Sequence, residues 1–170
     1  MPEVEAFDPP VDSLLAGLSD IPGIYLDCFK LIAPFPYTLQ DLVLAFYTTP
    51  LFKAERTVLR FTARRLSTDA EALALASGHT DRFAIWKVED RRTDEILLGE
   101  SSGRTKSWLG VAAIANGTEL MFGSAVLPVK GRDGQPTLGP VFHTLLGAHK
   151  VYSRALLAAA GRGITQASAG

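Results

Sequence analysis

Apolar and polar positions alternate along four segments in the second half of the chain, which is typical of β-strands. The segments are residues 82–89, 95–100, 106–115 and 118–129. Asn116-Gly117 separates the last two, and both central residues of a two-residue type I′ turn need a positive φ, which Asn and Gly tolerate. The pattern predicts an antiparallel meander of about four strands that ends in a hairpin.

One further strand and three helices are predicted before the meander. Residues 23–33 mix aromatic and β-favouring side chains before two prolines, which predicts a first strand. Apolar residues then recur at helical spacing in residues 39–47, 51–65 and 69–77. Capping-box pairs, Thr38 with Asp41 and Thr68 with Glu71, mark the start of the first and third helices.

A long helix is predicted from Pro140 to about Gly161. Its apolar face has one histidine and one serine: Phe142, Leu145, Leu146, His149, Ser153, Leu156, Leu157 and Ala160. Residues 1–22 are rich in proline and predict an arm wrapped on the body, residues 23–161 a single domain, and residues 162–170 a flexible tail.

This order of elements, a strand, two or three helices, an antiparallel meander and a long C-terminal helix, predicts the α+β class and the helix-grip fold. In that fold a curved antiparallel sheet holds the terminal helix (START/Bet v 1-like). The strands number about five, fewer than the seven of a full helix-grip sheet, so a shortened variant is expected.

Several stretches resemble an uncharacterised bacterial family grouped with the START-like, polyketide-cyclase-like (SRPBCC) proteins. They are residues 94–99 (DEILLG), the helix pair interrupted at Thr49-Pro50, the strands around Trp108 and Phe122, and residues 149–157 (HKVYSRALL). The resemblance covers residues 23–161. The superfamily includes lipid carriers, hormone receptors, aromatase/cyclases and hydrolase-like members, so the resemblance implies the fold and leaves the chemistry open.

Charge and composition favour a cytoplasmic domain without a nucleic-acid partner. Seventeen Lys and Arg against eighteen Asp and Glu give a net charge of −1, so no global positive field attracts nucleic acid. A basic run at Arg56, Arg60, Arg64 and Arg65 fits a solvated helix face. Cys28, the one cysteine, is expected in the core of a protein from a reducing compartment. No signal peptide or membrane span is expected.

His149 is the most informative candidate for a functional residue, because it lies in the apolar stripe with Ser153 one turn later. It is expected to be a hydrogen-bonded structural histidine, a ligand contact or a general base. A Ser153-His149 triad is disfavoured because the chain has no Gly-x-Ser-x-Gly turn. His79 and His143 complete no metal-ligand spacing, so neither a metal nor a cofactor is expected.

Aromatic residues of the predicted strands and helices either wall an apolar pocket or pack as core. They are Phe46, Trp86, Trp108, Phe122 and Tyr152, and with His149, Tyr152 or Ser153 as a polar contact they form the predicted ligand site.

Three hypotheses of function follow. The first is a non-catalytic module that binds a hydrophobic or amphipathic small molecule between the sheet and the C-terminal helix. The second is a cyclase/dehydratase-like enzyme that uses the same cavity, and the third is a solid-core structural domain. A second copy of the chain, in a homodimer, is a further candidate partner.

Overall fold

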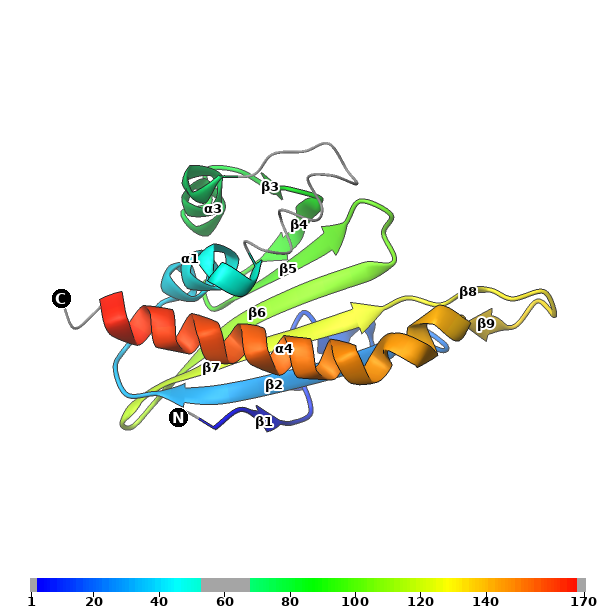
Figure 1. Cartoon of the computed structure of the whole chain (residues 1–170), viewed down its shortest axis with the longest axis horizontal. Helices are drawn as coiled ribbons and strands as arrows, with labels where there is room; N and C mark the ends of the chain where they lie inside the picture. Colours follow the sequence, from blue (N-terminus) through cyan, green and yellow to red (C-terminus); the bar gives the residue numbers. More distant parts are fainter. Residues whose placement is uncertain (1–2, 53–67, 168–170) are drawn as a thin grey trace.

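The computed structural model describes residues 3–52 and 68–167, and its centre is a seven-stranded antiparallel sheet (Figure 1). The strands lie in the order β1-β2-β7-β6-β5-β4-β3. Their bounds are β1 Glu5–Ala6, β2 Tyr25–Ala33, β3 Arg82–Phe83, β4 Trp86–Arg91, β5 Glu95–Glu100, β6 Thr105–Ile114 and β7 Gly117–Val126. A separate pair, β8 Val129–Lys130 and β9 Pro136–Thr137, follows β7.

Three described helices cover one face of the sheet (Figure 1). They are α1 Leu39–Thr48, α3 Asp69–Ala76 and α4 Pro140–Ala167. α4 packs on β2 and β7, while α1 packs between α4 and α3 and over β6. The first long strand therefore pairs with the last one, and the C-terminal helix lies across both. This arrangement is the predicted α+β helix-grip fold.

The prediction of about five strands is wrong, because the sheet has seven. The residues predicted as one strand, 82–89, form two, since Ala84 has a φ of 53° and the chain reverses there. The other addition, β1, is a two-residue strand of the arm that pairs with β2. Two-residue strands are too short to show an alternating pattern.

The β6–β7 hairpin is confirmed, but its turn is not the one predicted. Ile114 pairs with Gly117, so the loop residues are Ala115 and Asn116. Gly117 has the expected positive φ, at 147°, whereas Asn116 does not. A β-carbon on Gly117 would overlap the carbonyl oxygen of Ala33 on β2, so the tertiary contact requires glycine here.

The two capping boxes are confirmed: Thr38 with Asp41 starts α1, and Thr68 with Glu71 starts α3. In each box the threonine side chain accepts from the third backbone N–H, and the acidic side chain accepts from the threonine backbone N–H. Most of the predicted helix at residues 51–65, with the basic run of arginines, lies outside the described residues.

α4 extends beyond the end predicted at Gly161 and continues to Ala167. The residues after Gly161 are small and polar, which predicts a tail, and glycine itself disfavours helix. Tertiary packing overrides that preference. Gly161 lies against Leu31 of β2, so closely that an added β-carbon would be 3.0 Å from its side chain, and Ile164 is buried in the core.

The sheet buries apolar side chains on both faces. The inner face, under the helices, holds the large core, which includes Phe29, Leu31, Leu120 and Leu157. The outer face holds a smaller cluster that the N-terminal arm covers: Leu15, Cys28, Leu97, Trp108, Met121 and Ala125. Because side chains alternate along each strand, the sheet separates two apolar clusters, one on each face.

Candidate functional site

Polar side chains from β2, β7 and α4 meet on the inner face of the sheet, near the first residues of β2. Asp27 and Ser124 are direct cross-strand neighbours, and His149 of α4 lies over both. The His149 Nε2 atom is 2.9 Å from Ser124 Oγ and 3.3 Å from Asp27 Oδ2. Tyr25 donates its hydroxyl hydrogen to Asp27 Oδ2 at 2.9 Å. We call these four residues the Asp27 cluster.

The hydrogen-bond directions give His149 a donor role. Ser124 Oγ–H donates to Asp27 Oδ1, so the serine oxygen is left to accept from His149. The same Nε2–H faces Asp27 Oδ2. In a nucleophilic triad the histidine accepts the serine proton with one ring nitrogen and donates to the acid with the other. The Asp27 cluster uses one nitrogen for both, so it fixes the orientation of the ring and does not activate Ser124.

Burial and hydrogen bonding oppose each other at the Asp27 carboxyl. Burial alone would raise its pKa, but the hydrogen bonds from His149, Ser124 and Tyr25, with the charge of His149, bring the pKa below its ordinary value. Burial, followed by the negative charge of Asp27, raises the pKa of the Tyr25 hydroxyl. The cluster therefore holds Asp27 ionised and Tyr25 neutral at pH 7.

We expect Asp27→Asn to lower the free energy of unfolding by about 2 kcal/mol at neutral pH, since it removes a charged acceptor of several hydrogen bonds. A lowered pKa means that the carboxylate contributes fully above the ordinary aspartate pKa of about 4 and loses its contribution as pH falls through the lowered value. The difference between wild type and variant should therefore shrink below about pH 4. Urea unfolding from pH 2 to 8 measures it.

The control is Asp20→Asn, at an exposed position of the arm. It should leave both the stability and its pH dependence unchanged. A wild-type minus Asp27→Asn difference that stays constant from pH 2 to 8 would contradict an ionised, hydrogen-bonded Asp27.

A hollow of about 390 Å³ opens beside the cluster, between the first half of α4 and the adjoining end of the sheet. Four lining side chains are apolar and four are polar: Val126, Leu138, Phe142, Leu146, Ser102, Arg104, Thr105 and His149. Phe142 packs edge to face on Tyr25, with ring centroids 4.9 Å apart, so the same tyrosine supports both the wall of the hollow and Asp27. The volume is in the range of small-molecule sites.

Two further hollows lie elsewhere on the described part of the molecule. One groove of about 500 Å³ runs between α1 and the last turns of α4, lined by Tyr37, Leu44 and Ile164 among others. The other, of about 400 Å³, lies on the outer face beside the arm, with Glu95, Trp108 and Met121 in its lining. Neither contains a residue of the Asp27 cluster.

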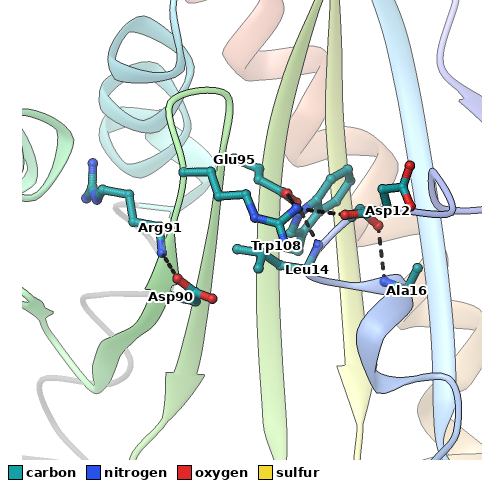
Figure 2. Close-up of polar contacts among 9 residues, drawn as sticks. Asp12, Leu14, Ala16, Asp90, Arg91, Glu95 and Trp108 are labelled. Carbon is teal, nitrogen blue, oxygen red and sulfur yellow. Dashed lines mark hydrogen bonds and ion pairs between the residues drawn. The ribbon is translucent and has the colours of Figure 1, made fainter.

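The outer-face hollow adjoins a buried carboxylate that fixes the arm to the sheet. Glu95 accepts from the Trp108 indole N–H at 2.6 Å and from the Leu14 backbone N–H at 2.8 Å (Figure 2). Arg92 bridges Glu95 and the Asp12 carbonyl oxygen, at 2.7 Å to each. The Glu95 carboxylate is thus fully used by donors of the protein itself, from Trp108, Leu14 and Arg92. Its role is therefore structural.

The structure does not bring the seven predicted ligand-site residues into one pocket. Phe46 and Phe122 pack in the inner core with ring centroids 4.8 Å apart. Trp86 and Tyr152 pack at the margin of the same core. Trp108 lies on the opposite face of the sheet, against the arm. It cannot line a cavity under α4, because its strand neighbour Leu109 is the one that points inward.

Of the predicted polar contacts, His149 lines the hollow and Ser153 does not. Ser153 is 1% exposed, and its hydroxyl has no hydrogen-bond partner in the part of the chain that the structure describes. It lies one turn further along α4, where the helix enters the apolar core. The two residues share a helix face, as expected, but only His149 is at its open end.

Sequence reasoning missed Tyr25, Asp27, Ser124 and Arg104. One signal was present: Tyr25 and Asp27 share the face of β2 that also presents Phe29 and Leu31, and a carboxylate on an inward face needs partners. Ser124 joins them only through the strand register, and Arg104 only through the approach of α4.

Other candidate chemistry is structural. Burial raises the pKa of the Cys28 thiol to about 12, so this cysteine is not a nucleophile at neutral pH. Within residues 3–52 and 68–167, no group of three or more His, Cys, Asp or Glu side chains is placed to hold a metal ion. None of the described helices combines the length and the apolarity needed to cross a membrane.

The fold and the hollow define a helix-grip α+β protein with a partly polar site beside its C-terminal helix. No protein-family model matches the chain, and no curated protein sequence matches it. Among solved structures, one titled "Crystal structure of Ara h 8.0201" matches with a TM-score of 0.40 and 8% identity over 85% of this chain and 99% of that chain. We base the fold assignment on the strand order and on the packing of α4.

Proposed function

We propose that the protein binds a small amphipathic molecule in the hollow between the first half of α4 and the sheet, as a non-catalytic binding module. The observation that carries the proposal is the composition of this hollow: Val126, Leu138, Phe142 and Leu146 on one side, and Arg104, Thr105, Ser102 and His149 on the other. An apolar surface with a few convergent polar groups is typical of ligand sites. The proposal includes membership of the START-like superfamily that the sequence resembles.

The Asp27 cluster supports this function because it fixes one of the polar contacts in advance. Asp27 and Ser124 occupy Nε2 of His149, so the ring is oriented before any ligand arrives. A group whose rotamer is already fixed costs less conformational entropy on binding. The other ring nitrogen, Nδ1, makes no hydrogen bond with the described residues, and in this proposal it is the atom of His149 that contacts the ligand.

An acid–base enzyme is the second candidate, favoured by the pairing of His149 with a carboxylate. Such a pair orients a catalytic histidine in many active sites. Ser124 shares the same ring nitrogen, however, and donates its hydroxyl hydrogen to Asp27, so His149 has no serine proton to accept. A binding module needs fewer functional groups than an enzyme, and the side chains that line the hollow are sufficient for it.

Filling the hollow tests the site. We expect Leu146→Trp to weaken binding of the anionic, amphipathic dye 8-anilinonaphthalene-1-sulfonate by about tenfold or more, because the larger side chain occupies the volume that the dye needs. Fluorescence titration measures the dissociation constant. Native mass spectrometry of the purified protein, in parallel, looks for a co-purified small molecule that the variant lacks.

The control is Val151→Trp on the same helix, where the native side chain is 70% exposed and faces solvent. It should bind the dye as the wild type does. Equal dye binding by wild type and Leu146→Trp would show that the dye binds elsewhere and would remove the support for this hollow as the ligand site.

A further inference from the structure

Arg104 is the one arginine or lysine that lines the hollow beside α4, and the protein leaves its charge uncompensated. Its Nη2 donates to the Leu138 carbonyl oxygen at 3.3 Å, and its Nε–H is buried without a hydrogen-bond partner. No carboxylate of the described residues lies within ion-pair distance of it. A buried donor without a partner is unfavourable, and more so when it belongs to a charged group. Among the described residues the guanidinium makes one hydrogen bond, to Leu138, so most of its N–H donors remain free for an acceptor in the hollow.

Glu100, four residues before Arg104, and Asp27, in the cluster beside the hollow, are both already engaged. Glu100, at the start of the same turn, accepts from Ser102 through its backbone N–H at 2.9 Å and through its hydroxyl. Asp27 accepts from Tyr25, Ser124 and His149. Neither forms an ion pair with Arg104, so among the described residues no carboxylate occupies the guanidinium.

The backbone holds Arg104 firmly at the mouth of the hollow. Its carbonyl oxygen accepts from the Leu127 N–H at 2.7 Å, just past the end of β7. Its N–H donates to Ser102 Oγ at 3.3 Å. The bond to Leu138 ties the side chain to the segment that leads into α4. The guanidinium is therefore set between the sheet and the helix, with Phe142 and Leu146 on the far wall.

We propose that the ligand of this hollow is an amphipathic carboxylate, and that Arg104 binds its carboxylate group while the tail lies against Val126, Phe142 and Leu146. The inference rests on the proposed binding function and specifies the class of molecule. A planar guanidinium matches a carboxylate with two parallel hydrogen bonds. Thr105 supplies a neutral hydroxyl donor beside it, and the single permanent positive charge of Arg104 matches a single negative charge.

A matched pair of probes tests the headgroup. Decanoate and 1-decanol share a ten-carbon chain and differ in the charged group, and isothermal titration calorimetry measures both. We expect wild-type protein to bind decanoate at least about tenfold more tightly than 1-decanol, as a charge-assisted hydrogen-bond pair contributes. We expect Arg104→Gln to weaken decanoate binding by roughly tenfold to a hundredfold and to change 1-decanol binding less than about twofold.

Arg162→Gln is the control for the loss of one positive charge, because Arg162 is exposed and lies in the last turns of α4. It should leave both affinities unchanged. Arg104→Lys retains the charge without the planar fork and should lose part of the preference for decanoate. Urea unfolding of each variant verifies that it is folded, and the affinity of Arg104→Gln for 1-decanol gives a second check.

The outcomes separate the two proposals. If wild type binds both probes equally and Arg104→Gln changes neither affinity, the carboxylate assignment is overturned while the binding function stands. If wild type binds neither probe at millimolar concentration, nor the dye, both proposals are overturned. A preference for decanoate that Arg104→Gln abolishes and Arg162→Gln retains establishes Arg104 as the carboxylate contact.

Discussion

Glu95→Ala is expected to lower the free energy of unfolding by about 4 kcal/mol, the largest effect of any substitution considered for this protein. The carboxylate is almost fully buried and accepts hydrogen bonds from the Trp108 indole, the Leu14 backbone and the Arg92 side chain. Removing it leaves two neutral donors and one cation without their acceptor. Trp108 and Leu14 are in no position to find water without moving apart, because the arm covers the indole.

The same substitution should release the arm from the outer face. Leu14 is joined to the sheet through Glu95, as Figure 2 shows. The Asp12 carbonyl is joined to it through Arg92, which also donates to Glu95. Hydrogen exchange at the Leu14 amide should therefore accelerate more than exchange in β6 or β7. Urea unfolding gives the free energy, and exchange measured by NMR gives the local effect.

Glu119→Ala is the matched control on the same face of the sheet. Glu119 pairs with Lys30 at 2.9 Å, and both side chains are partly exposed. An ion pair of this kind contributes about 0–1 kcal/mol, so its loss should be small. If Glu95→Ala and Glu119→Ala lose the same free energy, or if the Leu14 amide stays protected in the first, Glu95 does not hold the arm.

Gly117→Ala is expected to cost about 3 kcal/mol or more, because two separate effects act at that position. Its φ of 147° is a backbone conformation that side-chain-bearing residues rarely adopt. An added β-carbon would also overlap the Ala33 carbonyl oxygen, a backbone atom that cannot turn away. The β6–β7 hairpin and the end of β2 would have to separate, and the unfolding free energy from urea titration should fall accordingly.

Gly147→Ala is the control for adding a methyl group to glycine. Gly147 lies in α4, and nothing is within 4 Å of the position that a β-carbon would take. Alanine has the higher helix propensity, so this variant should gain about 0.5–1 kcal/mol. Equal and small changes at positions 117 and 147 would mean that the turn accommodates a side chain, contrary to the geometry described above.

Much of the fold could be predicted from local patterns. Alternation predicted β5, β6 and β7 to within two residues at their starts, and the capping boxes at Thr38 and Thr68 predicted the starts of α1 and α3. Each of these signals depends on residues a few positions apart. The errors have a different origin. The end of α4 depends on Gly161 packing against Leu31, and the turn before β7 depends on Gly117 meeting Ala33.

The site was harder to predict than the fold. His149 was identified because a histidine in an apolar helical stripe is conspicuous, and the structure does place it at the hollow. Trp108 was predicted to line the ligand site, but it lies on the opposite face of the sheet. Its position in the strand does not reveal which face α4 covers. Arg104 looked like an ordinary charge in a hairpin turn. The absence of a carboxylate partner among the described residues depends on what surrounds Arg104 in space and not on its neighbours in sequence.

The sequence by itself determined the elements, their order and hence the α+β helix-grip class, because secondary structure and short connections depend on periodicity, capping and turn residues. Only the tertiary structure decided which polar groups meet. Asp27, Ser124 and His149 come from three elements, and a register shift of one residue in β2 or β7 would turn Asp27 or Ser124 to the outer face. The hollow beside Arg104 likewise exists only because α4 crosses the end of the sheet at that place.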